Sequence, residues 1–122
     1  MPARKAFARY LRERARPDSD FEGAELIYAE LVGNVVRHAP GPIRIDLLWA
    51  DDGRAALRVA DGGAGFNPVS AISRDRLNET GRGLIIVASL AIRIRVDRHS
   101  EGSAVTAVLR VLRVVADAEM ST

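Results

Sequence analysis

The sequence contains no cysteine and has few aromatic residues, which make up 5% of the chain. Without cysteine it can form neither disulfides, a thiolate metal site nor a cysteine nucleophile. It also has no apolar run of about 18 residues and no signal-peptide pattern. We therefore expect a cytoplasmic protein that does not enter a membrane.

The chain has little net charge, because 18 basic residues face 16 acidic ones. Its positive charge is concentrated in residues 1–16, where Glu13 is the only acid. The basic residues of this segment are Arg4, Lys5, Arg9, Arg12, Arg14 and Arg16. Such a segment is compatible with nucleic-acid or anionic-membrane binding, but a solvated helix face is the simpler interpretation. We expect no direct nucleic-acid partner.

The 122 residues, 48% of them apolar and 28% charged, predict one globular domain, 1–122. Residues 3–15 suit a helix that Pro17 ends. The run 19–22, Ser-Asp-Phe-Glu, matches a capping box in which the Ser19 hydroxyl caps a second helix. That helix is expected to end at about Ala39, before Pro40-Gly41-Pro42.

An alternating strand follows, with Ile43, Ile45, Leu47 and Trp49 on one face. The run 51–53, Asp-Asp-Gly, predicts a hairpin turn, and the return strand places Leu57 and Val59 inward. Asp61 has the same parity as those two residues, so its carboxylate is expected on the core side. A carboxylate is costly there unless it has hydrogen-bond donors.

Two glycine-rich segments follow this strand. Residues 61–66 read Asp-Gly-Gly-Ala-Gly-Phe, and 67–80 form a polar segment. Thr80-Gly81-Arg82-Gly83 is expected to open a helix that continues from Leu84 to about Leu90. A glycine-rich helix start offers backbone N–H groups and a positive dipole end to an anion. Residues 92–96 and 104–111 predict two further antiparallel strands.

Four polar residues lie on the second helix, on the shoulder of its apolar face. They are Glu30, Asn34, Arg37 and His38. Taken alone, Glu30 and Asn34 could be an exposed i, i+4 pair, and His38 a capping or core residue. The Asp61 turn and the glycines at 81 and 83 could equally be a plain turn and a plain helix start.

In this order and spacing the three motifs resemble the nucleotide-binding boxes of the Bergerat-fold ATPases, which include type II topoisomerases, heat-shock chaperones, mismatch-repair proteins and histidine kinases. The boxes are Glu30-x-x-x-Asn34-x-x-Arg37-His38, Asp61-x-Gly63-x-Gly65 and Gly81-x-Gly83-Leu84. The resemblance covers about residues 4–111 and leaves 112–122 as a tail. It implies a two-layer α/β (α+β) sandwich with a mixed or antiparallel sheet of at least four strands, covered by helices on one face.

The resemblance also implies roles in binding Mg²⁺ and ATP. Asn34 would be the metal ligand, Glu30 the general base and Asp61 the acceptor for the adenine amino group. Residues 66–80 would close over the nucleotide as a lid. The residues assigned to the cofactor are Asn34, Arg37, His38, Asp61, Gly63, Gly65, Thr80, Gly81, Arg82, Gly83 and Leu84.

Within this superfamily, the runs AELVGNVVRHA and ETGRGLIIVASLA look most like the small anti-sigma-factor serine/threonine kinases. That likeness implies a kinase whose partners are a sigma factor or an anti-anti-sigma factor, and a homodimer is compatible with it. A non-catalytic module, sensing nucleotide or lacking it, and a histidine kinase catalytic domain acting in trans are the alternatives. Histidine kinases typically have asparagine at the position of Glu30.

Two departures from the family pattern stand out. The family begins with a strand before the first helix, so we expect the sheet to lack an edge strand. The family also favours threonine after the last hairpin glycine, where this chain has Gly102-Ser103-Ala104. Ser103 and Thr106 are the candidate substitutes for that hydroxyl.

Overall fold

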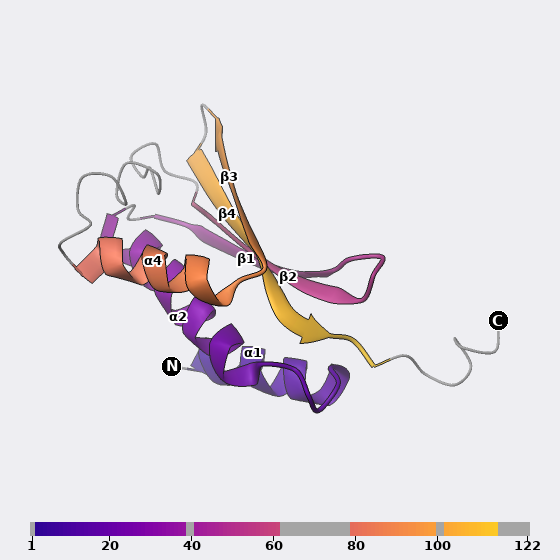
Figure 1. The fold of residues 1–122 in the computed structure, drawn as a ribbon. Coiled ribbons are helices and arrows are strands. Elements are labelled where there is room, and N and C mark those ends of the chain that lie inside the picture. The colour runs from indigo at the N-terminus through magenta and orange to yellow at the C-terminus, as the bar shows by residue number, and fades with distance from the viewer. Residues whose placement is uncertain (1, 39–40, 62–78, 100–101, 115–122) are drawn as a thin grey trace.

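The computed structural model describes residues 2–38, 41–61, 79–99 and 102–114, which form two layers (Figure 1). The helices are α1 (Pro2–Arg14), α2 (Phe21–His38) and α4 (Glu79–Leu90). The strands are β1 (Ile43–Trp49), β2 (Arg54–Asp61), β3 (Arg93–His99) and β4 (Gly102–Leu112). None of the described helices is long and apolar enough to cross a membrane.

The described strands form one sheet in the order β1-β2-β4-β3, with every neighbouring pair antiparallel. In the centre, Val59 of β2 lies opposite Ile45 of β1 and Val105 of β4. The helices cover one face of this sheet (Figure 1). The predicted two-layer sandwich is therefore confirmed, with an antiparallel sheet.

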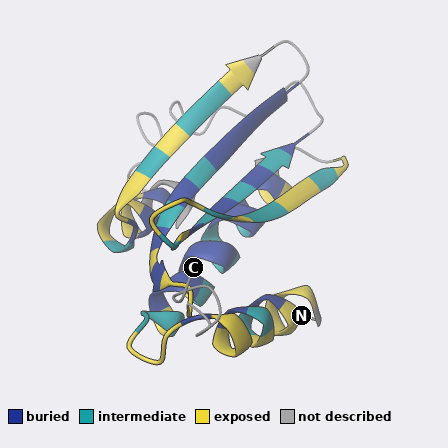
Figure 2. Ribbon diagram, turned by 90° about the vertical axis from the view of Figure 1, so that its right-hand side faces the viewer, coloured by how far each residue is buried: buried dark blue, intermediate teal, exposed yellow. Residues whose placement is uncertain are grey.

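The core lies between α2 and the two central strands. Leu57 and Val59 are 0% and 2% exposed, and they face Leu31 and Val35 of α2 in the same apolar cluster. β2 alternates between buried and less buried positions, whereas β4 is buried throughout residues 102–105 and alternates after them (Figure 2). The predicted inward parity is confirmed and extends to Asp61, which is 5% exposed.

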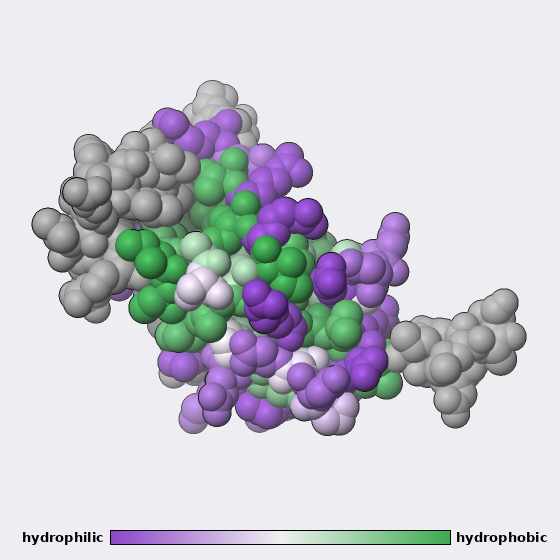
Figure 3. Space-filling view, in the orientation of Figure 1, coloured by the Kyte–Doolittle hydropathy of each residue, from purple (hydrophilic) through white to green (hydrophobic). Residues whose placement is uncertain are grey.

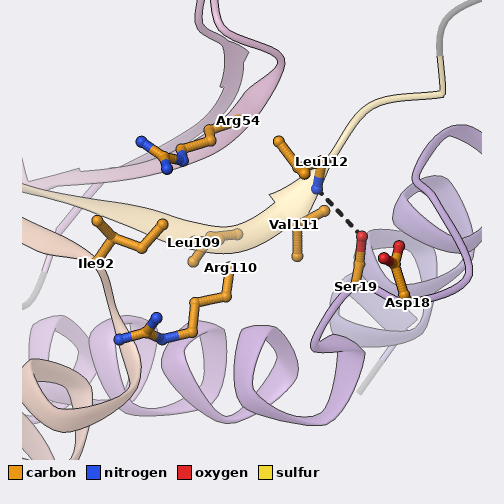
Figure 4. Close-up of a pocket in the computed structure, with 8 residues that line it drawn as sticks. All are labelled: Asp18, Ser19, Arg54, Ile92, Leu109, Arg110, Val111 and Leu112. Atoms are coloured by element: carbon orange, nitrogen blue, oxygen red, sulfur yellow. Dashed lines mark hydrogen bonds between the residues drawn. The ribbon is translucent and has the colours of Figure 1, made fainter.

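The start of α2 differs from the predicted capping box. Asp20 is the cap, because its Oδ1 accepts a hydrogen bond from the Gly23 N–H at 2.9 Å. Ser19 instead accepts a hydrogen bond through Oγ from the Leu112 N–H at 3.1 Å (Figure 4). The prediction that Ser19 caps the helix was wrong because the end of β4, distant in sequence, takes its hydroxyl.

The glycine-rich segment before Leu84 is helical, since α4 begins at Glu79. The helix that Thr80-Gly81-Arg82-Gly83 was expected to open is therefore confirmed; it begins one residue before Thr80, ends at Leu90 as expected, and has Gly81 and Gly83 in its first turns. Leu84 and Val87 are buried, whereas Ile85 and Ile86 are 50% and 36% exposed. Figure 3 shows apolar side chains gathered over this helix.

Replacing Asp20 with alanine should lower the free energy of unfolding by about 1 kcal/mol, because the Gly23 N–H loses its acceptor. Urea denaturation followed by far-ultraviolet circular dichroism measures the change. Asp18→Ala is the matched control, since Asp18 pairs only with the exposed Arg16 beside it. Equal stability of the Asp20→Ala variant and wild type would contradict the cap assignment.

Candidate functional site

Asn34 is the most deeply buried polar residue of α2, at 1% exposure. Its Oδ1 accepts a hydrogen bond from Arg37 Nη2 at 2.9 Å. Its Nδ2 has no partner among the described residues. The amide lines an apolar space too narrow for a water molecule, whose other lining residues are Leu31, Val35, Val59, Leu84 and Val105. The Asn34 amide therefore makes only part of its possible hydrogen bonds, at a position whose surroundings would suit an apolar side chain.

Asp61 shows the same partial satisfaction at the end of β2. Its Oδ2 accepts a hydrogen bond from Ser103 Oγ at 2.8 Å, and its Oδ1 has no partner among the described residues. Ser103 lies opposite Asp61 in the β2–β4 register. Of the two predicted substitutes, Ser103 is thus the hydroxyl beside the carboxylate, whereas Thr106 has the opposite parity on β4.

The sheet places Asp61 next to the space around Asn34. Val59 and Val105 line that space, and Asp61 and Ser103 lie one pleat further along the same face of the same strands. Asp61 itself does not line it. The two half-satisfied side chains therefore occupy neighbouring positions in the layer between α2 and the sheet.

The first and last boxes meet where Glu30 contacts Gly83. A Cβ placed on Gly83 would lie 2.5 Å from Glu30 Oε2 and 3.1 Å from its Cδ, so the carboxylate lies directly against the glycine backbone. A carboxylate is favoured near the N-terminal turns of a helix, where Gly83 lies. Nothing in the sequence indicates this contact, since the two residues are 83 − 30 = 53 positions apart.

A second glycine makes room for Arg37. A Cβ on Gly33 would lie 3.3 Å from Arg37 Nη1, closer than most side-chain contacts. The guanidinium that bonds Asn34 therefore lies in the space that Gly33 leaves open. The i, i+3 spacing of Asn34 and Arg37 is the sequence signal for this pair.

The other predicted site residues fall at helix ends or outside the described ranges. His38 is the last residue of α2, and Thr80, Gly81 and Arg82 lie in the first turns of α4. Leu84 is 3% exposed and lines the space around Asn34. Gly63, Gly65 and residues 66–78 of the expected lid lie outside the described residues.

Figure 4 shows a different pocket, of about 200 Å³, where Arg54, Arg110 and Ser19 lie around the end of β4. Arg54 begins β2 and Asp61 ends it, so the pocket lies about 24 Å along the strand from the candidate site. It therefore does not belong to that site. The described residues contain no cluster of three acidic, histidine or cysteine side chains that could hold a metal.

Comparison with known proteins identifies the family. The family model of the histidine kinase-like ATPase domain matches residues 1–109, and the chain belongs to this family. No curated protein matches the chain.

Two solved structures share the fold. The mycobacterial sensor histidine kinase MprB is 23% identical, with a TM-score of 0.61 over 78% of this chain and 74% of that one. The Acinetobacter baumannii histidine kinase AdeS is also 23% identical, with a TM-score of 0.55 over 74% of this chain. The match spans 46% of the AdeS chain, less than half its length.

Replacing Asn34 with leucine should stabilise the nucleotide-free protein by about 1 kcal/mol, because the unpaired Nδ2 no longer has to be buried. Arg37→Ala is the opposing control, since it removes the partner of Oδ1 and leaves the whole amide unpaired. That variant should lose about 1 kcal/mol. Urea denaturation of both variants measures the two changes. A leucine variant less stable than wild type would show that the amide is required by the fold.

Proposed function

We propose that this protein binds Mg-ATP and phosphorylates a serine or threonine of a protein partner that controls transcription. The observation that carries the proposal is the pair of buried, half-satisfied groups at Asn34 and Asp61. An unpaired buried polar atom costs about 1–3 kcal/mol. Retaining two of them at neighbouring positions is understandable if one ligand completes both, with a donor for Asp61 Oδ1 and an acceptor, such as a phosphate oxygen, for Asn34 Nδ2.

Asp61 suits the adenine end of the nucleotide. Its Oδ1, which has no partner among the described residues, can accept a hydrogen bond, and the exocyclic amino group of adenine can donate one. Ser103 Oγ donates to Oδ2 and so fixes the orientation of the carboxylate. Guanine carries a carbonyl where adenine carries the amino group, so this geometry favours ATP over GTP.

Asn34 suits the metal end, with one rearrangement. Its Oδ1 is bonded to Arg37, an exposed residue, so the guanidinium would have to move away for a metal ion to bind there. Mg²⁺ takes oxygen ligands and commonly keeps only one or two from the protein, together with phosphate oxygens and water. When bound, Mg-ATP supplies a γ-phosphoryl group whose charge is partly neutralised. Arg37, once released from Asn34, becomes available to offset phosphate charge.

Glu30 suits the role of general base. Its half-buried carboxylate is held against Gly83 in the first turns of α4, one helical turn from Asn34 on α2. There it would accept the proton of the attacking hydroxyl.

The exposed side of α4 supports a protein substrate. Ile85 and Ile86 lie two and three positions after Gly83, and both are apolar and exposed. Exposed apolar groups of this kind are typical of protein contacts. The choice of a sigma factor or anti-anti-sigma factor as the partner rests on the resemblance of the sequence motifs to anti-sigma kinases.

Incubation with γ-³²P-labelled ATP and candidate anti-anti-sigma proteins tests the proposal. Wild type should transfer an acid-stable label to serine or threonine. Glu30→Gln should lower the rate by about 100-fold or more, because a general base contributes that much or more to such a transfer. Glu25→Gln is the matched control on the same helix, where Glu25 pairs only with Arg12, and it should leave the rate unchanged.

The other outcomes distinguish the competing functions. ATP binding without transfer to any partner would favour the non-catalytic module. An acid-labile label would indicate phosphohistidine and a histidine kinase acting in trans. Transfer that survives Glu30→Gln at the wild-type rate would contradict the general-base role of Glu30.

A further inference from the structure

The outer edge of β1 is the least protected part of the described sheet. Among the described strands β1 pairs with β2 alone, so the N–H and C=O groups on its other side have no strand partner in the described part of the chain. Only Arg44 and Asp46 of its seven residues are charged. Edge strands that avoid pairing with other chains are usually rich in charge. The composition of β1 therefore favours the addition of another strand.

An apolar groove of about 490 Å³ lies beneath this edge, between β1 and α1. Phe7 and Tyr10 of α1 line it from one side, and Ile45 and Leu47 of β1 from the other. Ile45 remains 38% exposed although its parity directs it toward the helices. In a strand added to β1, every second side chain would point into the layer between the sheet and α1. Apolar side chains at those positions would cover the groove.

The sequence of β1 is complementary to itself in one register. A twofold axis perpendicular to the sheet keeps every side chain on its own face, so directly opposite positions must have numbers with an even sum. Centring the axis on Ile45 places Arg44 opposite Asp46 of the second copy, and Asp46 opposite its Arg44. On the helix side, Ile45 then meets its own copy and Ile43 meets Leu47.

The neighbouring registers are worse. An axis at Asp46 would place two aspartates opposite each other, and an axis at Arg44 would place two arginines opposite each other. Like charges directly opposite are destabilising in antiparallel pairs. Within one chain Arg44 Nε already lies 3.0 Å from Asp46 Oδ2, so the pairing at Ile45 would extend this into a four-charge row on the open face.

We propose that the protein forms a twofold-symmetric dimer through antiparallel pairing of β1 with β1 of a second copy, centred on Ile45. The two four-stranded sheets become one continuous sheet, and the apolar groove of each copy is covered by the helix-side residues of the other's β1. The occupant is a second copy because the strand matches itself in both charge and apolar pattern.

The opposite edge, β3, is better protected. Four of its seven residues are charged: Arg93, Arg95, Asp97 and Arg98. Self-pairing centred on Val96 would match Arg95 with Asp97, but it would set Arg98 opposite Ile94 on the helix side. Burying that guanidinium against an apolar residue is unfavourable. The β3 edge therefore serves as the internal control.

Because the natural chain has no cysteine, single cysteine variants report strand pairing directly. Ile45→Cys should form a disulfide-linked dimer under mild oxidation, since opposite Cα atoms in antiparallel strands lie within disulfide range. Leu48→Cys should not, because the proposed register separates the two copies of residue 48 by about 20 Å. Val96→Cys should also remain monomeric under the same conditions.

Light scattering after size exclusion measures the same assembly without cross-linking. The wild-type mass should be 2 × 13.2 = 26.4 kDa. Arg44→Asp should weaken the dimer on the order of tenfold, because two aspartates then face each other at both symmetric positions. Combining Arg44→Asp with Asp46→Arg should restore the affinity by exchanging the charges. Thermal unfolding shows that each variant is folded.

The proposal would be overturned if the wild-type chain stayed monomeric at a high concentration of about 100 µM. A dimer in which Val96→Cys cross-links and Ile45→Cys does not would also overturn it, as would a double charge exchange that fails to restore the affinity. None of these outcomes bears on ATP binding, because the candidate nucleotide site involves none of these residues.

Discussion

The need to complete the hydrogen bonds of buried polar atoms is the constraint on which this structure depends. Among the described residues, Asn34 Nδ2 and Asp61 Oδ1 are the buried side-chain atoms that have no partner. They lie at neighbouring positions in the layer between α2 and the sheet, where the other buried residues are apolar except Ser103, which bonds Asp61. Buried polar groups normally have partners, so two exceptions at one place indicate a binding site.

The rest of the site follows from how closely the surrounding backbone approaches. Gly83 allows α4 to lie against the Glu30 carboxylate, and Gly33 leaves space for the Arg37 guanidinium beside Asn34. A β-carbon at Gly83 would overlap the carboxylate, and one at Gly33 would press against the guanidinium at 3.3 Å. The glycines therefore fix the positions of one anion and one cation around the buried amide.

The sequence predicts those features that arise from local periodicity. The alternation of β2 places Asp61 inward, and the helical spacing of α2 places Asn34 beside its apolar stripe, both as observed. Contacts between distant segments were not predictable, because nothing in the order of residues connects Ser19 with Leu112 or Glu30 with Gly83. Because Ser19 bonds Leu112, Asp20 is the residue that caps α2. The contact between Glu30 and Gly83 brings the first and the last of the three motifs together.

The central claim is that Asp61 and Asn34 hold the two ends of one nucleotide. Isothermal titration calorimetry with ATP and GTP, each with Mg²⁺ and with EDTA, tests it directly. ATP should bind at least about tenfold more tightly than GTP. Asp61→Asn should lose that preference, whereas Asn34→Leu should keep it and lose the dependence on Mg²⁺. Equal binding of ATP and GTP by the wild type, or no binding of either, would contradict the account.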